Sequence, residues 1–138
     1  MAVLVLEVAI FVAIFAGVSA YQTRNLLETD RQPAPALGGT TLDGFHYDLA
    51  DSVGRPVLVY FFAPWCAFCA ASADNVVRLG KFRGEALDIV VVALDWQDSA
   101  EVQEYVNEHD LDNGVLLGGP SVARDWQVQG FPTYYVLD

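Results

Sequence analysis

The segment GRPVLVYFFAPWCAFC, residues 54–69, decides the fold of this chain. Residues 56–62 form a continuous apolar run, which predicts a strand buried on both faces, as in a parallel or mixed sheet. Pro64 ends this run, and from Cys66 to about Phe82 the apolar residues recur at helical spacing. The sequence therefore predicts a buried strand that passes into a helix at Cys66.

Strand and helix patterns alternate along the rest of the chain, which predicts an α/β fold with right-handed crossovers between parallel strands. An Asp43-Gly44 turn between two short extended runs predicts a hairpin before the first buried strand. The further predicted strands are 87–94, 115–117 and 133–137. The further predicted helices are 99–109, with Ser99 as its N-cap, and 121–126.

Cys66 and Cys69 are the only cysteines, and their Cys-x-x-Cys spacing indicates a redox pair or half of a metal site. A zinc site needs two more ligands, and neither His46 nor His109 forms a second paired motif. Two inert core cysteines are a further alternative. The position at a strand-to-helix corner, beside Trp65, favours the redox pair.

The helix that starts here gives the two cysteines different expected roles. A sulfur at a helix N-terminus meets unpaired backbone N–H groups and the positive end of the helix dipole, which lower the pKa of the thiol. A cysteine three residues later lies one helical turn away. We therefore expect Cys66 to be the nucleophile and Cys69 to be the resolving thiol.

A second feature is Gly130-Phe131-Pro132-Thr133, directly before the last predicted strand. Pro132 cannot donate a hydrogen bond to a sheet, so it is either an ordinary proline at a strand start or part of a cis Phe131–Pro132 bond. The second interpretation places backbone beside the cysteines.

The N-terminus is apolar from residue 2 to residue 20, apart from Glu7 and Ser19. Nineteen residues span roughly 29 Å as a helix, which is close to the thickness of a bilayer core. An uncleaved anchor is the favoured interpretation, and a cleaved signal peptide is the alternative because Val18-Ser19-Ala20 resembles a cleavage pattern. The predicted organisation is an anchor or signal in 1–21, a linker in 22–34 and one domain in 35–138.

The formal net charge of −11 limits the possible partners. Nucleic-acid binding is excluded, since such proteins carry a basic surface. The same charge would repel anionic lipid headgroups, so surface electrostatics is not expected to hold the domain at a membrane.

Three stretches carry a resemblance to a known family: GRPVLVYFFAPWCAFC, DIVVVALDWQDSAEVQEYVNEHDL and VARDWQVQGFPTYYVLD. With the hairpin, they cover roughly residues 35–138, and the chain resembles the thioredoxin superfamily, within it the TlpA-like membrane-tethered reductases of bacterial envelopes. The resemblance implies a thioredoxin-like fold, with a central mixed sheet flanked by helices. It also implies that the helix at 99–109 is the insertion of this branch.

The resemblance further implies a thiol–disulfide oxidoreductase that reduces protein disulfides through Cys66 and Cys69. Pro132 would be the cis-proline, the backbone at Phe131 would pair with substrate, and Trp65 would shield the site. The redox-active disulfide would be the only redox group, with no other cofactor and no metal. The expected location is the inner membrane, single-pass with the domain facing the periplasm, and a membrane electron donor would be the partner.

The chain departs from the family in several places. Tyr60 stands where plain thioredoxins have a buried Asp, and Ser72 and Asp74 stand where many TlpA-like members have Glu and Pro. The side chains of the Ala67-Phe68 dipeptide carry no polar hydrogen, which favours a reductant over an oxidant. The family continues beyond position 138 with one more strand and a helix, so we expect this sequence to be a fragment.

The alternative function from a different class is a copper-binding or copper-delivery protein on the same fold. Copper chaperones of the Sco type use Cys-x-x-x-Cys with a distal histidine. Here the spacing is shorter and no histidine lies near Pro132 in the sequence. Binding of copper by the two thiols alone stays open at this point.

Overall fold

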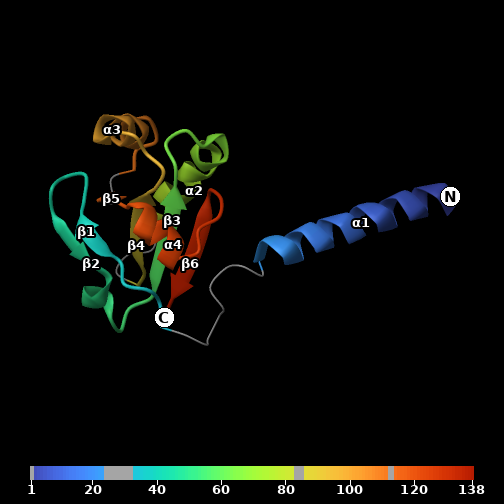
Figure 1. Cartoon of the computed structure of the whole chain (residues 1–138), viewed down its shortest axis with the longest axis horizontal. Helices are drawn as coiled ribbons and strands as arrows, with labels where there is room; N and C mark the ends of the chain where they lie inside the picture. The colour runs from blue at the N-terminus through green and yellow to red at the C-terminus, as the bar shows by residue number, and fades with distance from the viewer. Residues whose placement is uncertain (1, 24–32, 83–85, 112–113) are drawn as a thin grey trace. The chain divides into compact units, whose positions relative to one another are not determined.

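The computed structural model describes residues 2–23, 33–82, 86–111 and 114–138. The chain divides into two compact units, residues 1–32 and residues 33–138 (Figure 1). Most of the predicted linker, residues 24–32, lies outside the described residues.

The first unit consists of helix α1, Ala2–Thr23, which agrees with the helical N-terminus expected from the sequence. Its large apolar side chains are exposed from Val5 to Tyr21, Phe11 to 76% and Val18 to 50%. Within the described residues, no helix combines the length and the apolar character needed to cross a membrane. The transmembrane part of the prediction for residues 1–21 is therefore not supported.

The second unit is built on a mixed four-stranded sheet in the order β5-β4-β3-β6. Strand β4 runs parallel to β3 and to β5, and β6 runs antiparallel to β3. The strands are β3 Val57–Phe62, β4 Asp88–Ala93, β5 Leu116–Leu117 and β6 Thr133–Leu137. All six residues of β3 are buried, as its apolar run predicts for a central strand.

The predicted hairpin is formed by β1, Gly38–Thr40, and β2, His46–Asp48. The Asp43-Gly44 turn closes it, with the amide of Gly44 donating to the carbonyl of Thr41 at 2.9 Å. The hairpin is tied to the main sheet because the amide of Leu42 donates to the carbonyl of Val115, next to β5, at 2.7 Å. A short 3-10 helix, Leu49–Ser52, follows.

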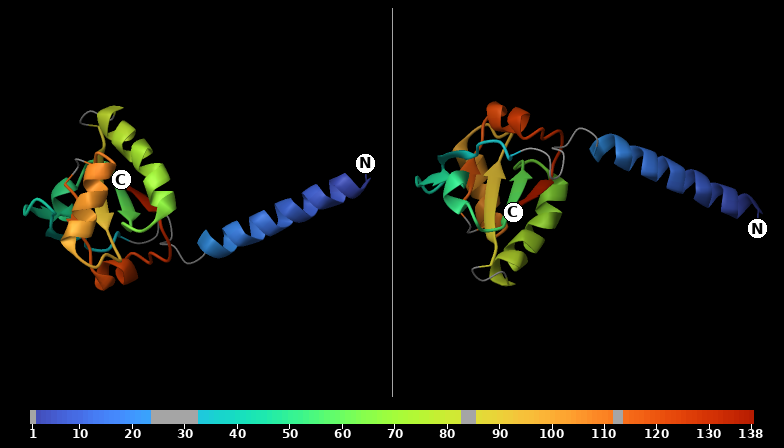
Figure 2. Two further views of the ribbon diagram at one scale, coloured as in Figure 1. Left: turned by 90° about the horizontal axis from the view of Figure 1, so that it is seen from above. Right: turned by 90° about the horizontal axis from the view of Figure 1, so that it is seen from below.

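Helices cover both faces of the sheet, and Figure 2 shows α2 and α4 on opposite sides of it. The helices of this unit are α2 Ala67–Phe82, α3 Ser99–Glu108 and α4 Pro120–Asp125. Successive residues of a strand point to opposite faces, so β3 contributes to two cores. Phe62 stacks on Tyr105 of α3 at 4.6 Å, whereas the Phe61 ring meets Trp126, after α4, at 5.4 Å.

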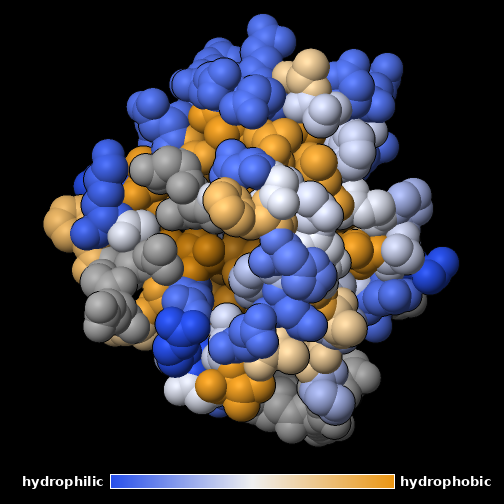
Figure 3. Space-filling view, turned by 90° about the vertical axis from the view of Figure 1, so that its left-hand side faces the viewer, coloured by the Kyte–Doolittle hydropathy of each residue, from blue (hydrophilic) through white to orange (hydrophobic). Residues whose placement is uncertain are grey.

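Helix α3 is amphipathic: Val102 and Tyr105 are buried, and Glu104 and Glu108 are exposed. The top of Figure 3, where α3 lies in Figure 1, is accordingly hydrophilic. The predicted N-cap of this helix was wrong. Asp98, not Ser99, is the N-cap, because its backbone is extended and its carboxylate accepts a hydrogen bond from the amide of Glu101 at 2.9 Å.

We expect Asp98→Ala to lower the free energy of unfolding by about 1 kcal/mol, because the amide of Glu101 loses its acceptor. Ser99→Ala is the matched control and should change it by less than about 0.5 kcal/mol. Urea unfolding of the three proteins checks this. Equal losses in the two variants would contradict the capping role of Asp98.

Candidate active site

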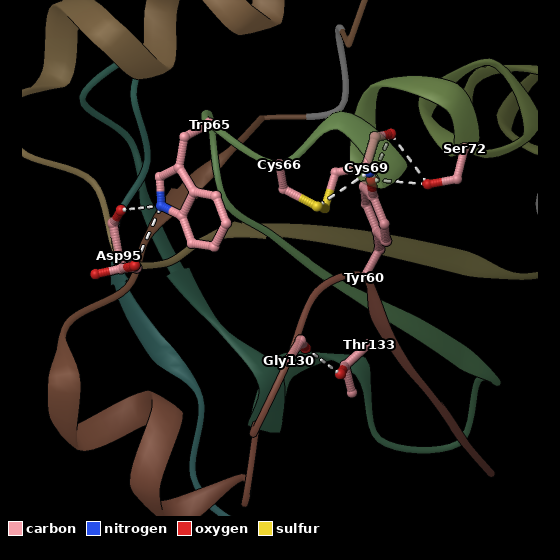
Figure 4. Close-up of a disulfide and its surroundings, with 8 residues drawn as sticks. All are labelled: Tyr60, Trp65, Cys66, Cys69, Ser72, Asp95, Gly130 and Thr133. Atoms are coloured by element: carbon pink, nitrogen blue, oxygen red, sulfur yellow. Dashed lines mark hydrogen bonds between the residues drawn. A yellow bond between two sulfur atoms is a disulfide. The ribbon is translucent and has the colours of Figure 1, made fainter. Parts of the chain in front are cut away.

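Cys66 and Cys69 lie where β3 passes into α2, at the corner that the sequence predicted. Their side chains are joined by a disulfide, and their Cα atoms are 5.2 Å apart (Figure 4). Cys66 directly precedes the first residue of α2, and Cys69 lies in its first turn. The buried strand therefore fixes the position of the first sulfur, and the helix fixes that of the second.

The first turn of α2 gives the two sulfurs different surroundings. The amide of Cys69 donates a hydrogen bond to Sγ of Cys66 at 3.1 Å, which is the contact expected of a sulfur at a helix N-terminus. Cys66 keeps 5% of its surface exposed, whereas Cys69 is completely buried. An incoming disulfide can therefore reach Cys66 first, and the same amide would stabilise negative charge on that sulfur after reduction.

Trp65 forms the exposed rim of the site and is fixed from two sides. Its indole Nε1 donates to the backbone carbonyl and to the carboxylate of Asp95, each at 3.1 Å (Figure 4). Its ring also meets the ring of Phe131 edge-on at 5.9 Å. Trp65 nevertheless remains 61% exposed, so an apolar aromatic surface borders the disulfide.

Asp95 is the site residue that the sequence did not single out. It lies two residues after the end of β4, and its φ of 52° is typical of a turn. Its bond to Trp65 joins residues 30 positions apart, so no local pattern could reveal it.

The segment before β6 lies beside the same cluster. The Phe131–Pro132 peptide bond is cis, as the second interpretation of the Gly-Phe-Pro-Thr motif expected. Phe131 packs against the buried cluster that contains both cysteines. Thr133 donates through Oγ1 to the carbonyl of Gly130 at 2.7 Å, which closes the turn (Figure 4).

Two hydroxyl groups, those of Tyr60 and Ser72, lie at the backbone carbonyl of Cys69. Tyr60 and Ser72 both donate to the carbonyl of Cys69, at 3.2 and 3.0 Å, and their own oxygens are 3.3 Å apart. Burial raises the pKa of Tyr60 above its usual value of 10, so this hydroxyl stays neutral at physiological pH. The pair can position the backbone of Cys69, but it offers no anionic base.

Removing one of these hydroxyls should have a measurable cost. We expect Tyr60→Phe to lower the free energy of unfolding by about 1 kcal/mol, because the Cys69 carbonyl loses one donor while the ring and its packing remain. Ser72→Ala and the double variant complete a mutant cycle. Strict additivity of the two losses would contradict the shared acceptor.

The cysteines have no partner ligands for a metal in the described residues. Among residues 2–23, 33–82, 86–111 and 114–138, no three His, Cys, Asp or Glu side chains are grouped to hold an ion. His109 instead packs against the ring of Tyr105 at 4.4 Å.

Comparison with known proteins gives a consistent family match. The family described as Redoxin matches residues 29–138. The thioredoxin-like protein YneN of Bacillus subtilis is 30% identical over 129 residues, which are 90% of this chain and 76% of YneN. The thiol-disulfide oxidoreductase ResA of Bacillus cereus is 27% identical over 107 residues, 76% of this chain but only 61% of ResA.

The fold also has solved counterparts. The crystal structure of a thiol:disulfide interchange protein of the thioredoxin family from Chlorobium tepidum superposes with a TM-score of 0.69. It is 26% identical, and the match covers 81% of each chain. The thioredoxin-like arrangement of sheet and helices is thereby established.

Proposed function

Because this chain belongs to the Redoxin family and is a thiol–disulfide oxidoreductase, we propose that it reduces disulfides of protein substrates outside the bacterial cytoplasm. The observation that carries the proposal is the pair of sulfurs at the start of α2, one slightly exposed and the other buried. A pair arranged in this way can take up a substrate at one sulfur and release it with the other.

The proposed reaction begins with the reduced pair. The Cys66 thiolate attacks one sulfur of the substrate disulfide, the substrate S–S bond breaks, and the leaving thiolate takes up a proton. The Cys69 thiol then attacks Cys66 in the mixed disulfide, and its proton goes to the released substrate sulfur. In total, two electrons and two protons pass to the substrate, and the Cys66–Cys69 disulfide remains.

The dipeptide between the cysteines supports the reducing direction. Strong oxidants of this fold are oxidants because their reduced thiolate is stabilised. Here the side chains of Ala67 and Phe68 carry no polar hydrogen that could reach the sulfur, and Phe68 is 79% exposed. The reduced form therefore gains little extra stability and can give up its electrons.

A reductant must be recharged, so we propose a dithiol partner in the membrane as the electron donor. The apolar segment 2–20 supports a location at the membrane, because exposed apolar side chains along a helix favour lipid over water. The proposed role of this segment is to bring the domain to the outer side of the inner membrane, as an anchor or as an export signal.

The function is tested by two measurements on the full chain. We expect the reduced protein to reduce insulin disulfides. We also expect the Cys66–Cys69 pair to have a redox potential below about −200 mV, measured by equilibration with glutathione buffers. Titration with Cu(I) runs in parallel. Absence of insulin reduction together with tight Cu(I) binding would favour the copper-delivery alternative instead.

The location is tested separately with reporters fused after residue 138. An alkaline phosphatase fusion should be active and a green fluorescent fusion dark if the domain lies outside the cytoplasm. An inactive phosphatase fusion together with a fluorescent green fluorescent protein fusion would place the domain in the cytoplasm and refute this part of the proposal.

A further inference from the structure

A surface cavity of about 590 Å³ lies next to the aromatic rim of the disulfide site. We call it the Asp95 cavity. It is formed between the segment after β4, the segment that leads into α4, and the residue before the cis-proline. Its walls include Asp95, Trp96, Gly119, Pro120, Ala123 and Phe131.

The cavity is continuous with the site through two of its walls. Phe131 lines the cavity and at the same time touches the ring of Trp65, the residue before Cys66. Asp95 lines the cavity and accepts the indole hydrogen bond of Trp65, which Figure 4 shows beside the cysteines. A polypeptide whose disulfide lies at Cys66 can therefore reach the cavity with a neighbouring side chain.

The chemistry of the walls favours a cation. Asp95 is exposed and supplies a carboxylate, and none of the lining residues is Lys, Arg or His. Phe131 and Trp96 add aromatic rings, and the indole of Trp96 is held in place because its Nε1 donates to the carbonyl of Gly118 at 2.9 Å. A cavity whose walls carry a carboxylate and aromatic rings can bind a Lys or Arg side chain, because the charged head and the apolar stem both find a partner.

We propose that the Asp95 cavity binds a Lys or Arg side chain that lies within a few residues of the disulfide of the protein substrate. This inference rests on the proposed reduction of protein disulfides. It adds a specificity-determining residue, Asp95, to a protein whose formal net charge of −11 already favours basic partners at a distance.

The test compares disulfide-bonded peptides that carry one Arg near the cysteine with matched peptides that carry Gln. We expect the wild type to reduce the best Arg peptide with a kcat/KM about fivefold higher than its Gln counterpart, and this ratio should fall with rising salt. Asp95→Asn should bring the ratio close to one. Asn tolerates the φ of 52° at this position, and the backbone carbonyl that also holds Trp65 is unchanged.

Glu104→Gln is the matched control, because it removes one exposed negative charge from α3 without touching the cavity. Its ratio should equal that of the wild type. The inference would be overturned by a wild-type ratio near one, by faster reduction of peptides that carry Leu in place of Arg, or by an equal fall of the ratio in both variants. In each of these cases the peptides are still reduced, so the proposed function would stand. Failure to reduce any peptide would refute the proposed function itself, and the inference with it.

Discussion

Replacing Cys66 by serine is expected to lower the rate of insulin reduction by at least about a thousandfold, to the uncatalysed rate. The physical reason is that a serine hydroxyl does not ionise near neutral pH and so cannot attack a disulfide sulfur. The side chain keeps nearly the same size at a position that is 5% exposed, so the fold should remain. Insulin turbidity, with circular dichroism as the folding check, measures the effect.

Cys69→Ser is the matched variant, because it removes the other sulfur of the same disulfide. It should retain the first attack but accumulate a mixed disulfide with the substrate, since no second thiol is present to release it. Mass spectrometry under non-reducing conditions detects this species. If Cys66→Ser accumulated the mixed disulfide and Cys69→Ser did not, the two assigned roles would be reversed.

The largest effect on stability is expected for Trp126→Ala, at about 3–5 kcal/mol. Trp126 is completely buried, and its ring meets the rings of Phe61 and Tyr135, each at 5.4 Å. Truncation would remove these contacts and leave a cavity in the core between the sheet and α4. Urea unfolding followed by circular dichroism gives the free energy of unfolding.

Trp65→Ala is the control for this prediction, because it makes the same chemical change at a side chain that is 61% exposed. It should lower the free energy of unfolding by less than about 1 kcal/mol. Comparable losses at the two positions would contradict the assignment of Trp126 to a closely packed core.

Local sequence patterns were enough to predict the positions of the main strands of the second unit. The apolar runs predicted β3 and β4 within one residue at each end, and β6 over its full length, 133–137. Strands β3 and β4 are buried on both faces, which requires apolar side chains on both, and such a composition is evident from the sequence. The prediction of Ser99 as the N-cap of α3 was wrong by one residue, because adjacent Asp98 and Ser99 are both good caps and only the backbone angles distinguish them.

Long-range contacts are the part that the sequence could not supply. Nothing in the local pattern indicates that Asp95 holds the indole of Trp65, or that Tyr60 and Ser72 share the carbonyl of Cys69. The resemblance to the thioredoxin superfamily implied only that Tyr60 and Ser72 stand where other members have carboxylates. The coordinates show which backbone oxygen they bind in this chain.

The sequence by itself determined where a buried strand gives way to a helix and therefore where the two sulfurs stand, because hydrophobic periodicity and helix geometry act over a few residues. Only the tertiary structure decided what surrounds those sulfurs. Trp65, Asp95 and Phe131 come from three separate segments, and their meeting depends on how the strands are ordered in the sheet and how the loops at its edge pack.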